Sequence, residues 1–465
     1  MTGPGLNERP NAGGSATFDS VSAFVLDRGF DAFPGEILTA AKFALLDTLG
    51  IAIASGPMEA GRIARDVASL LFSAGADNLA ARMLFDGRRV SLAGAAYAAA
   101  TEIDNLDGHD GYNPTKGHIG VVVLPTLAAL AEALPELGGR EALAAVVVGY
   151  EIAGRAGISL HATVSDYHTS GAWNALGVAA MAARLRKLTK AQFREALGIA
   201  EYHGPRSQMM REIATPTMLH DGSGWGAMVG LSAAVLAERG FTGAPAITIE
   251  APEVAAYWSD LGNFWQIERQ YIKPYPVCRW AHAAVDATRA LILQHDLKAE
   301  DIERITINSF AQAATLFAGM PDTTSKAQYS LAFAVATMVV HRKIGVEHIS
   351  GAGLSDPAVE AFLGKIEART IERHDVRFPT GRWADVTIRL VDGRLLNSGD
   401  VHARGGPESP FTREDIIEKF MEFSVPVLGA ARSAEIRDSV LGLSEPASRF
   451  STVAALLYDP PGNGA

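Results

Sequence analysis

The chain is short of cysteine, of basic charge and of long apolar runs, and each shortage excludes a class of protein. Cys278 is the only cysteine in 465 residues, so no intrachain disulfide can form, and we expect a reducing, cytoplasmic location. The formal net charge of −11 argues against nucleic acid and anionic membrane surfaces as partners. No apolar stretch reaches about 18 residues without a charge or a helix breaker, so no membrane-spanning helix is predicted.

Standard cofactor and nucleophile motifs are also missing. The sequence has no GxxxxGK[ST] phosphate loop, no GxGxxG after a strand, no HExxH, no CxxC and no GxSxG elbow. The segment DGSGWGAM at 221–228 is rich in glycine but has the wrong spacing for a nucleotide loop. A nucleotide cofactor is therefore not predicted.

What the sequence does have is a long first half rich in alanine and leucine. From Pro34 to about residue 240, apolar residues recur at helical spacing, as in ILTAAKFALLDTLGIAIAS and AMVGLSAAVLAERG. Thr189 followed by Gln192 predicts a capped helix start. Helices that are apolar most of the way round are typical of the interior of a large helical domain.

Near residue 300 the pattern changes to a mixture of strands and helices. RITINSF alternates like a strand, and ADVTIRLVDGRLLNSGDV predicts a hairpin that turns at Asp392 and Gly393. The fold class is therefore mainly α, with a large all-α helical domain built from both chain ends and an inserted α+β lid domain. The predicted boundaries are a flexible tail at 1–17, a helical domain at 18–266 plus 403–465, and the lid at 267–402.

The most informative stretch is the polar loop that begins at Asp104, DNLDGHDGYNPTKGHIGVVVLP. Several acids, two histidines and a lysine come directly before an apolar run, and three glycines and a proline break any long helix through them. Charged residues placed just before a buried helix build a polar pocket at the edge of a core. A solvated surface loop is the alternative, but later segments supply matching chemistry.

Three later segments carry further polar clusters. His168 in YHTSGAWNALG precedes a helix start that favours an anion, although a structural histidine is the alternative. His220 and Asp221 lie together in ATPTMLHDGSG. Lys273 lies on the stiff segment KPYP, which can aim a lysine but could equally be an interdomain linker.

These clusters, in this order, resemble the MmgE/PrpD family, which includes 2-methylcitrate dehydratase, cis-aconitate decarboxylase and iminodisuccinate epimerase. The resemblance runs from about Phe30 to Ser451 and rests on ALLDTLGIAIAS, GHIGVVVLP, YHTSGAWNALG, TMLHDGSG, KPYPVCRWAHAAVDA and ADVTIRLVDGR. It implies a large all-α domain, an α+β lid, a homodimer, and chemistry without a cofactor or a metal in an interdomain cleft.

The resemblance also assigns site residues. The catalytic positions that it implies are Asp104, His118, His168 and Lys273. The substrate-binding candidates are Asp107, His109, Lys116, His220, Cys278, Arg279 and His282. Two positions depart from the decarboxylase branch, because Thr217 stands where that branch has a lysine and Phe333 where it has a tyrosine.

The chemistry that the resemblance implies forms a carbanion next to a carboxylate, which needs nearby positive charge. Lys273, with Lys116 or Arg279, would bind a small anionic polycarboxylate and stabilise that charge. His118 and His168 would serve as general acid and base, and Asp104 would orient a histidine. Because the decarboxylase lysine and tyrosine are absent, we expect an epimerase of the iminodisuccinate epimerase type, with a dehydratase-like or decarboxylase-like lyase as the alternative.

Two other classes of protein remain open on the sequence alone. The first is a metal-dependent hydrolase or lyase, because oxygen- and imidazole-rich loops can hold a divalent cation. Its candidate ligands are Asp104, Asp107, His109, Asp110 and His118. The second is a binding protein that keeps the fold without catalysis.

Overall fold

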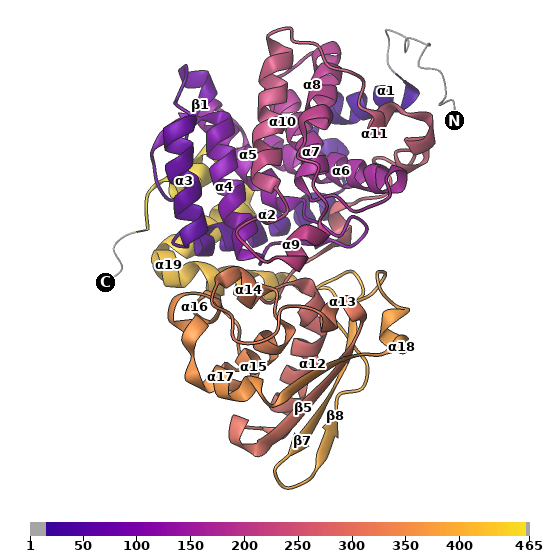
Figure 1. Cartoon of the computed structure of the whole chain (residues 1–465). Helices are drawn as coiled ribbons and strands as arrows, with labels where there is room; N and C mark the ends of the chain where they lie inside the picture. Colours follow the sequence, from indigo (N-terminus) through magenta and orange to yellow (C-terminus); the bar gives the residue numbers. More distant parts are fainter. Residues whose placement is uncertain (1–14, 462–465) are drawn as a thin grey trace.

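A computed structural model describes residues 15–461 of the chain. It is mostly helical with a small sheet, so the predicted mainly α fold class is confirmed. Figure 1 shows two lobes, a helical lobe at the top of the view and a lobe with the sheet below it. Most of the predicted tail lies outside the described residues, but helix α1 (Ala16–Ser22) begins inside it because the Ser15 hydroxyl accepts the N–H of Phe18.

The helical lobe contains the alanine-rich first half and the C-terminal helices. Its longer helices are α2 (Gly35–Ser55), α3 (Glu59–Leu71), α4 (Leu92–Leu106), α5 (Gly120–Ala133), α6 (Gly139–Thr163), α7 (Gly171–Leu185), α8 (Lys190–His203), α10 (Ser223–Glu238), α19 (Arg413–Leu441) and α20 (Phe450–Tyr458). Its short elements are α9 (Met210–Ala214), α11 (Ile247–Glu250), β1 (Ala80–Arg82), β2 (Arg89–Ser91) and β3 (Gly111–Tyr112). The capping box predicted at Thr189 starts α8.

The centre of this lobe is built from helices that are apolar all round. Every residue of α7 is buried, and α7 packs against α6. A Cβ atom at Gly177 would lie 2.7 Å from the carbonyl oxygen of Gly149, so the missing side chain lets the two backbones approach. Helices α2 and α6 are long and apolar enough to cross a membrane, but 78% and 94% of their most apolar windows are buried, as in core helices.

The sheet lobe contains the predicted α+β segment. Its elements are β4 (Gln270–Tyr271), α12 (Arg279–His295), β5 (Ile302–Ser309), α13 (Ala311–Ala314), α14 (Thr324–Gln328), α15 (Leu331–His341), α16 (Val346–Ile349), α17 (Pro357–Leu363), β6 (Ile366–Thr370), α18 (Glu372–Asp375), β7 (Trp383–Leu390), β8 (Leu395–Asn397) and β9 (Val401–His402). The sheet order is β6-β5-β7-β8, and β9 also pairs with β7. The predicted hairpin is present as β7–β8, and Gly393 has a φ of 90° in its turn.

The two lobes are joined at the polar loop. β3 in that loop pairs with β4 at the start of the sheet lobe, with Gly111 opposite Tyr271. A Cβ atom at Gly111 would lie 2.3 Å from the Tyr271 ring, so only glycine allows this pairing. We retain the predicted boundaries, 18–266 plus 403–465 and 267–402, as a proposal.

A buried ion pair holds the C-terminal helix α19 against α2. The ammonium of Lys419 lies 2.5 Å from Asp47 Oδ1 and donates to the carbonyl oxygen of Gly108 at 2.8 Å. Burial raises the pKa of Asp47 and lowers that of Lys419, and the attraction between the two charges opposes both shifts. Through Lys419, helix α19 therefore contacts the polar loop at Gly108 as well as α2.

Replacing Lys419 by methionine should destabilise the fold. Asp47 would keep its buried carboxylate without a cation, so we expect the free energy of unfolding to fall by about 3–5 kcal/mol. The double variant Asp47→Asn/Lys419→Met removes both charges and should recover much of that loss. Urea unfolding followed by circular dichroism measures the change, and a single variant as stable as the wild type would contradict the assignment.

Candidate active site

Three of the site's side chains are carried by residues with left-handed backbone. Asp107 ends α4 with a φ of 54°, and its N–H donates to the carbonyl oxygen of Asp104 at 3.1 Å. Lys116 and Asp221 have φ values of 54° and 40°. This region costs a non-glycine residue about 1–3 kcal/mol and persists where the surroundings enforce it, often at functional sites.

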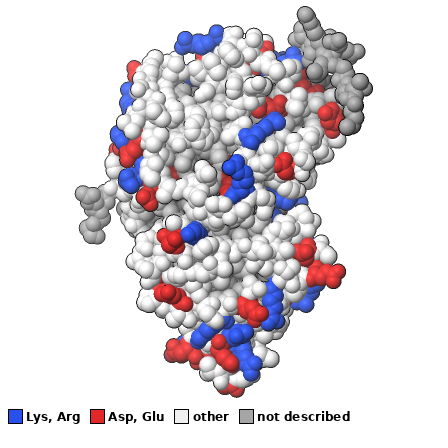
Figure 2. Space-filling model, viewed as in Figure 1, with Lys and Arg blue, Asp and Glu red and all other residues white. Residues whose placement is uncertain are grey.

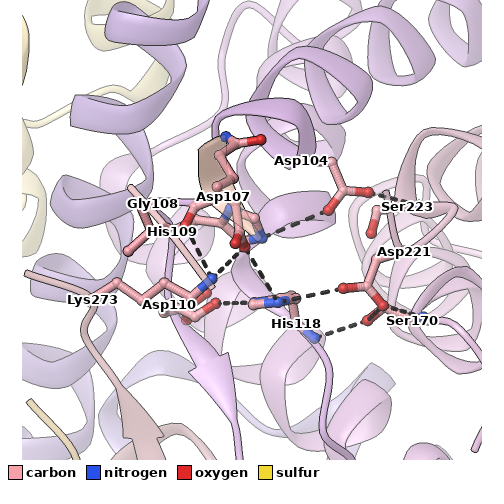
Figure 3. A network of polar contacts seen from close by, with 12 residues as sticks. Asp104, Asp107, Gly108, His109, Asp110, His118, Ser170, Asp221, Ser223 and Lys273 are labelled. Carbon is pink, nitrogen blue, oxygen red and sulfur yellow. Dashed lines mark hydrogen bonds and ion pairs between the residues drawn. The ribbon is translucent and has the colours of Figure 1, made fainter. Parts of the chain in front are cut away.

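His118 lies at the centre of the polar cluster that Figure 3 shows. Its Nδ1 is 2.6 Å from the carbonyl oxygen of Asp110, and its backbone N–H donates to the Ser170 hydroxyl at 2.9 Å. Its Nε2 faces two carboxylates, at 3.4 Å from Asp221 Oδ2 and 4.0 Å from Asp107 Oδ1. The Nδ1 contact fixes the ring and leaves Nε2 as the atom that can exchange a proton.

Asp221 is oriented by the start of α7. Its Oδ1 accepts hydrogen bonds from the backbone N–H and the hydroxyl of Ser170, at 3.0 and 2.8 Å. The same serine supports His118, so histidine and carboxylate are positioned by one residue. A Cβ atom at Gly117 would lie 2.4 Å from the Ser170 hydroxyl, so glycine is needed beside His118.

Asp104 belongs to the last turn of α4 and contacts the first residue of α10. Its Oδ2 accepts the N–H of Ser223 at 3.1 Å, where the positive end of a helix favours a carboxylate. Its Oδ1 is 3.7 Å from Nε2 of His109. The His109 ring is fully buried, lies 4.3 Å from the His118 ring, and has a pKa lowered by burial well below the usual histidine value.

Lys273 extends from the sheet lobe to the polar loop. Its ammonium forms an ion pair with the Asp107 carboxylate and donates to the Asp107 carbonyl oxygen at 3.0 Å. Burial acts to lower the pKa of Lys273, but the charge and hydrogen bond of Asp107, together with Tyr271 and Cys278, outweigh burial and the pKa is raised. Lys273 therefore remains a cation in a site from which water is largely excluded.

The cluster holds more acid than the cation can balance. Burial, and then the charge of Asp221, raises the pKa of Asp104 well above its usual value. Burial and the charge of Lys273 lower the pKa of His118, while Asp221 and Asp107 act to raise it. Protons in such a group belong to the cluster rather than to one residue. This is the property that general acid–base catalysis requires.

The opposite wall of the site carries two buried arginines. Arg279, the first residue of α12, donates to the carbonyl oxygens of Ala403 and Arg404, and Arg382 donates to that of Pro379. Both Nε atoms lack a hydrogen-bond partner, and within residues 15–461 neither guanidinium has a carboxylate partner. Burial lowers the pKa of Arg279 to about 10 and also lowers that of Arg382.

These two walls enclose one small cavity of about 40 Å³. The helical lobe contributes Asp107, Lys116, His118, Met209, Glu212, Ile213 and Asp221. The sheet lobe contributes Tyr271, Lys273, Cys278, Arg279, Trp280, Tyr329 and Arg382. The cavity has space for only a few water molecules, so the described conformation leaves little room between the two lobes at this point.

Comparison with known proteins identifies the family. The MmgE/PrpD N-terminal domain matches residues 19–264, and the MmgE/PrpD C-terminal domain matches residues 275–444. The chain belongs to the MmgE/PrpD family. It is therefore an enzyme of the MmgE/PrpD type, which bears out the resemblance and leaves no support for a binding protein without catalysis.

Curated relatives of this MmgE/PrpD enzyme are named as decarboxylases. Cis-aconitate decarboxylase of Homo sapiens is 26% identical over 417 residues, which cover 83% of each chain. Cis-aconitate decarboxylase of Aspergillus terreus is 24% identical over 474 residues, which cover 92% of each chain. These comparisons support the lyase that was the alternative in the sequence analysis rather than the epimerase that was preferred.

Some predicted residues of this MmgE/PrpD site line the cavity, others lie next to the lining residues, and two histidines lie away from the cavity wall. Asp107, Lys116, His118, Lys273, Cys278 and Arg279 line the cavity. Asp104 and His109 lie behind His118, and His220 lies against Tyr329 with its ring centroid 5.6 Å away. Burial raises the pKa of the Cys278 thiol to about 12, which disfavours the thiolate that a nucleophile requires.

Two predicted histidines lie away from the cavity wall. His282 is fully buried, and its Nε2 bonds to the Val277 carbonyl oxygen at 2.9 Å, which is the environment of a structural residue. His168 is half-buried, and its ring nitrogen lies 3.8 Å from Asp166. Among the described residues, no hydrogen bond or ion pair joins the His168 side chain to His118 or Lys273.

The two departures from the decarboxylase branch also lie away from the polar cluster. Thr217 is exposed beside a separate, larger hollow of about 1060 Å³. The lysines that line this hollow, Lys326 and Lys343, are paired with Asp322 and Glu347. Phe333 is fully buried in the core of the sheet lobe. The 40 Å³ cavity, and not the larger hollow, therefore collects the reactive side chains.

Within residues 15–461, the ligand atoms of the loop's acids and histidines do not converge as a group. The polar atoms of its acids are already bound, Asp107 by Lys273 and Asp110 by the Tyr150 hydroxyl at 2.6 Å. In the described part of the chain, the one group with converging ligand atoms is His374, Asp385 and Asp400 in the sheet lobe. Arg373 lies against both of those acids, so their charge is already compensated.

Sequence reasoning assigned no role to several residues of the cavity lining, and Glu212, Tyr329 and Arg382 are among them. None belongs to a segment with an evident motif. Arg382 precedes β7, and only the folding of the sheet brings it opposite His118. The sequence shows that Arg382 lies just before a predicted strand, but not that its side chain is buried.

The tautomer of His118 provides a direct test of this geometry. Because Nδ1 faces a carbonyl oxygen and burial lowers the ring's pKa, we expect a neutral ring that carries its proton on Nδ1 at pH 7.5. Long-range ¹H–¹⁵N correlation spectra of labelled protein, assigned with His118→Gln, measure this. A proton on Nε2 alone, or on both nitrogens, would contradict the orientation.

Proposed function

We propose that this enzyme is a lyase that acts on a small polycarboxylate through a carbanion, and that decarboxylation of a cis-aconitate-like tricarboxylate is its reaction. One observation carries the proposal. Two buried arginines without acid partners, Arg279 and Arg382, face a proton-exchanging cluster around His118 and Lys273 across one cavity. The names of the relatives support the choice of a lyase.

The arginine wall supports a substrate with more than one carboxylate. A buried guanidinium without an anion pays a desolvation cost that an incoming carboxylate offsets. Guanidinium groups bind carboxylates through paired N–H donors. Lys116 adds a third positive charge near this wall, although burial lowers its pKa to about 8. Carboxylates held there would direct the rest of the substrate toward the acidic cluster.

The opposite wall supports carbanion chemistry. When carbon dioxide leaves, the electron pair of the broken carbon–carbon bond stays on carbon and spreads onto a neighbouring carboxylate. The ammonium of Lys273 is fixed by Asp107 and stabilises this charge without reorganising. His118 presents Nε2 for proton exchange on the same wall.

Dehydration is the second candidate, because Thr217 and Phe333 replace the lysine and tyrosine of the decarboxylase branch. In dehydration, a base removes the proton next to a carboxylate, and an acid protonates the leaving hydroxyl. Neutral His118 is suited to the first step. The same arginine wall would bind either substrate, so the product distinguishes the two reactions.

Substrate entry requires the site to open. A cavity of about 40 Å³ is too small for a tricarboxylate. Because half of its lining comes from each lobe, separation of the lobes would open it and closure would exclude water from the carbanion. A lid function for the sheet lobe is therefore part of the proposal.

The homodimer expected from the resemblance also stays a proposal, and an exposed apolar face supports it. Trp225 and Leu236 are exposed on α10 with the half-buried Val229 between them, and the Trp225 ring lies 5.3 Å from that of Tyr97 on α4. Figure 2 shows few charged side chains on this part of the helical lobe. Such a face is typical of a subunit interface.

A substrate screen tests the proposed reaction. Purified enzyme is incubated with cis-aconitate and other small tri- and dicarboxylates in heavy water and followed by ¹H NMR. We expect release of carbon dioxide and deuterium at one carbon of the product. An alkene without carbon dioxide would identify the dehydratase, exchange of a carbon-bound proton without a new product would identify the epimerase, and no reaction with any polycarboxylate would overturn the proposal.

The arginine wall is tested by Arg382→Met. Loss of charge-assisted hydrogen bonds should weaken substrate binding by about 1.5–3 kcal/mol, seen as a higher KM, and Arg382→Lys should recover part of it. Arg377→Met is the matched control, because Arg377 is exposed and pairs with Asp400 at 2.7 Å. If Arg382→Met keeps the wild-type KM, the substrate carboxylates bind elsewhere.

A further inference from the structure

Two cavity residues outside the predicted set form a pair between the lobes. Glu212 lies on α9 in the helical lobe, and Tyr329 follows α14 in the sheet lobe. The Tyr329 hydroxyl donates to Glu212 Oε1 at 3.4 Å, and the backbone N–H of Asp221 donates to Oε2 at 2.7 Å. Both side chains are buried, and both line the cavity with His118 and Lys273.

The surroundings of Glu212 favour its neutral form. The acids that face it are Asp221 from the turn before α10, and Asp104 and Asp107 from the end of α4. Within residues 15–461, no ion pair joins Glu212 to a lysine or an arginine. A fourth carboxylate charge here would be buried beside three others. Burial, and then Asp221, accordingly raises the pKa of Glu212 well above its usual value.

Tyr329 is held in its protonated form by the same neighbours. Its phenol is buried, and the charged or titratable groups that face it are Glu212, Asp107, Cys278 and Asp221. Burial and the acids raise its pKa well above the usual tyrosine value. A phenol that is hydrogen-bonded to a neutral carboxylic acid can give up its own proton and then receive another from the acid.

The other hydroxyl and imidazole groups of the cavity are engaged differently. The Tyr271 ring lies under the Arg279 guanidinium, 4.4 Å from its centre, and so belongs to the arginine wall. Nε2 of His118 faces Asp221 and Asp107. Phe333, four residues beyond Tyr329, is buried in the core and offers no hydroxyl. Tyr329 is therefore the hydroxyl on the acidic side of the cavity.

We infer that Tyr329 is the catalytic proton donor of the proposed lyase and that Glu212 resupplies its proton. This inference rests on the proposed function. The bond between carbon and the leaving carboxylate breaks, carbon dioxide departs, and the electron pair remains on carbon. The carbanion takes the proton of the Tyr329 hydroxyl, and the phenolate takes the proton of Glu212. Glu212 regains a proton from water when the site opens.

The first test compares Tyr329→Phe with a control. Phenylalanine keeps the packing and removes only the hydroxyl, so kcat should fall by about 10²–10⁴-fold while KM changes little. Tyr202→Phe changes an exposed tyrosine on α8 and should leave kcat unchanged. A Tyr329→Phe enzyme within threefold of the wild-type kcat would overturn the inference and leave the lyase standing. A wild type that converts no polycarboxylate overturns both.

The second test asks whether Glu212 supplies the proton. Deprotonation of Glu212 should lower the wild-type kcat as pH rises, whereas Glu212→Gln should have a low kcat without this alkaline decline. Glu253→Gln, at an exposed position, is the control. An unchanged pH profile in Glu212→Gln would reduce Glu212 to a structural role and overturn its part in the proton supply.

Infrared difference spectra provide a readout that does not depend on turnover. At pH 7, the wild type should show a protonated carboxylic acid band that is missing from folded Glu212→Gln. Absence of a difference would mean that Glu212 is ionised, which overturns the proton supply even where activity is lost. Circular dichroism confirms that each variant is folded before its kinetics are interpreted.

Discussion

The site depends on the burial of several carboxyl groups around one histidine and one lysine. Lys273 is the ammonium that pairs with Asp107 in this group, and it comes from the other lobe. Without it, the acids beside His118 would be held together against their mutual repulsion in a medium that screens charge poorly. The ion pair is thus both a link between the lobes and the reason that the acidic cluster can exist in the closed state.

The same constraint divides the site into one half rich in carboxyl groups and one half that carries arginines. Acids that share protons lie on the helical lobe, whereas the arginines that lack acid partners lie on the sheet lobe. The polycarboxylate that we propose would complement both halves, because its carboxylates would meet the arginines and its reacting carbon would meet the proton-exchanging groups. Arginines gathered on one side of the site would allow an enzyme with a net charge of −11 to bind the anion that we propose.

The sequence was informative where function is concentrated in short segments. The loop from Asp104 to His118 and the KPYP segment were recognisable by residue type alone, and the structure joins them through Asp107 and Lys273. The mainly helical fold was predicted from the spacing of apolar residues, and the β7–β8 hairpin from alternating residues around a turn sequence.

Other features depend on tertiary contacts that periodicity does not encode. Asp104 was expected to orient a catalytic histidine and Asp107 to bind substrate, and only Asp107, where a left-handed residue turns the chain, lines the cavity. His282 stands in the same sequence segment as Arg279, but its side chain is buried in the core. Glu212, Tyr329 and Arg382 carry no motif and gain their importance only from the fold.

The most direct test of the account is a crystal structure with a saturated tricarboxylate that cannot react. We predict that the ligand lies between the lobes, with carboxylates on Arg279 and Arg382 and its carbon chain directed toward His118, Lys273 and Tyr329. A ligand bound in the larger hollow beside Thr217, or one that does not contact the arginines, would contradict it.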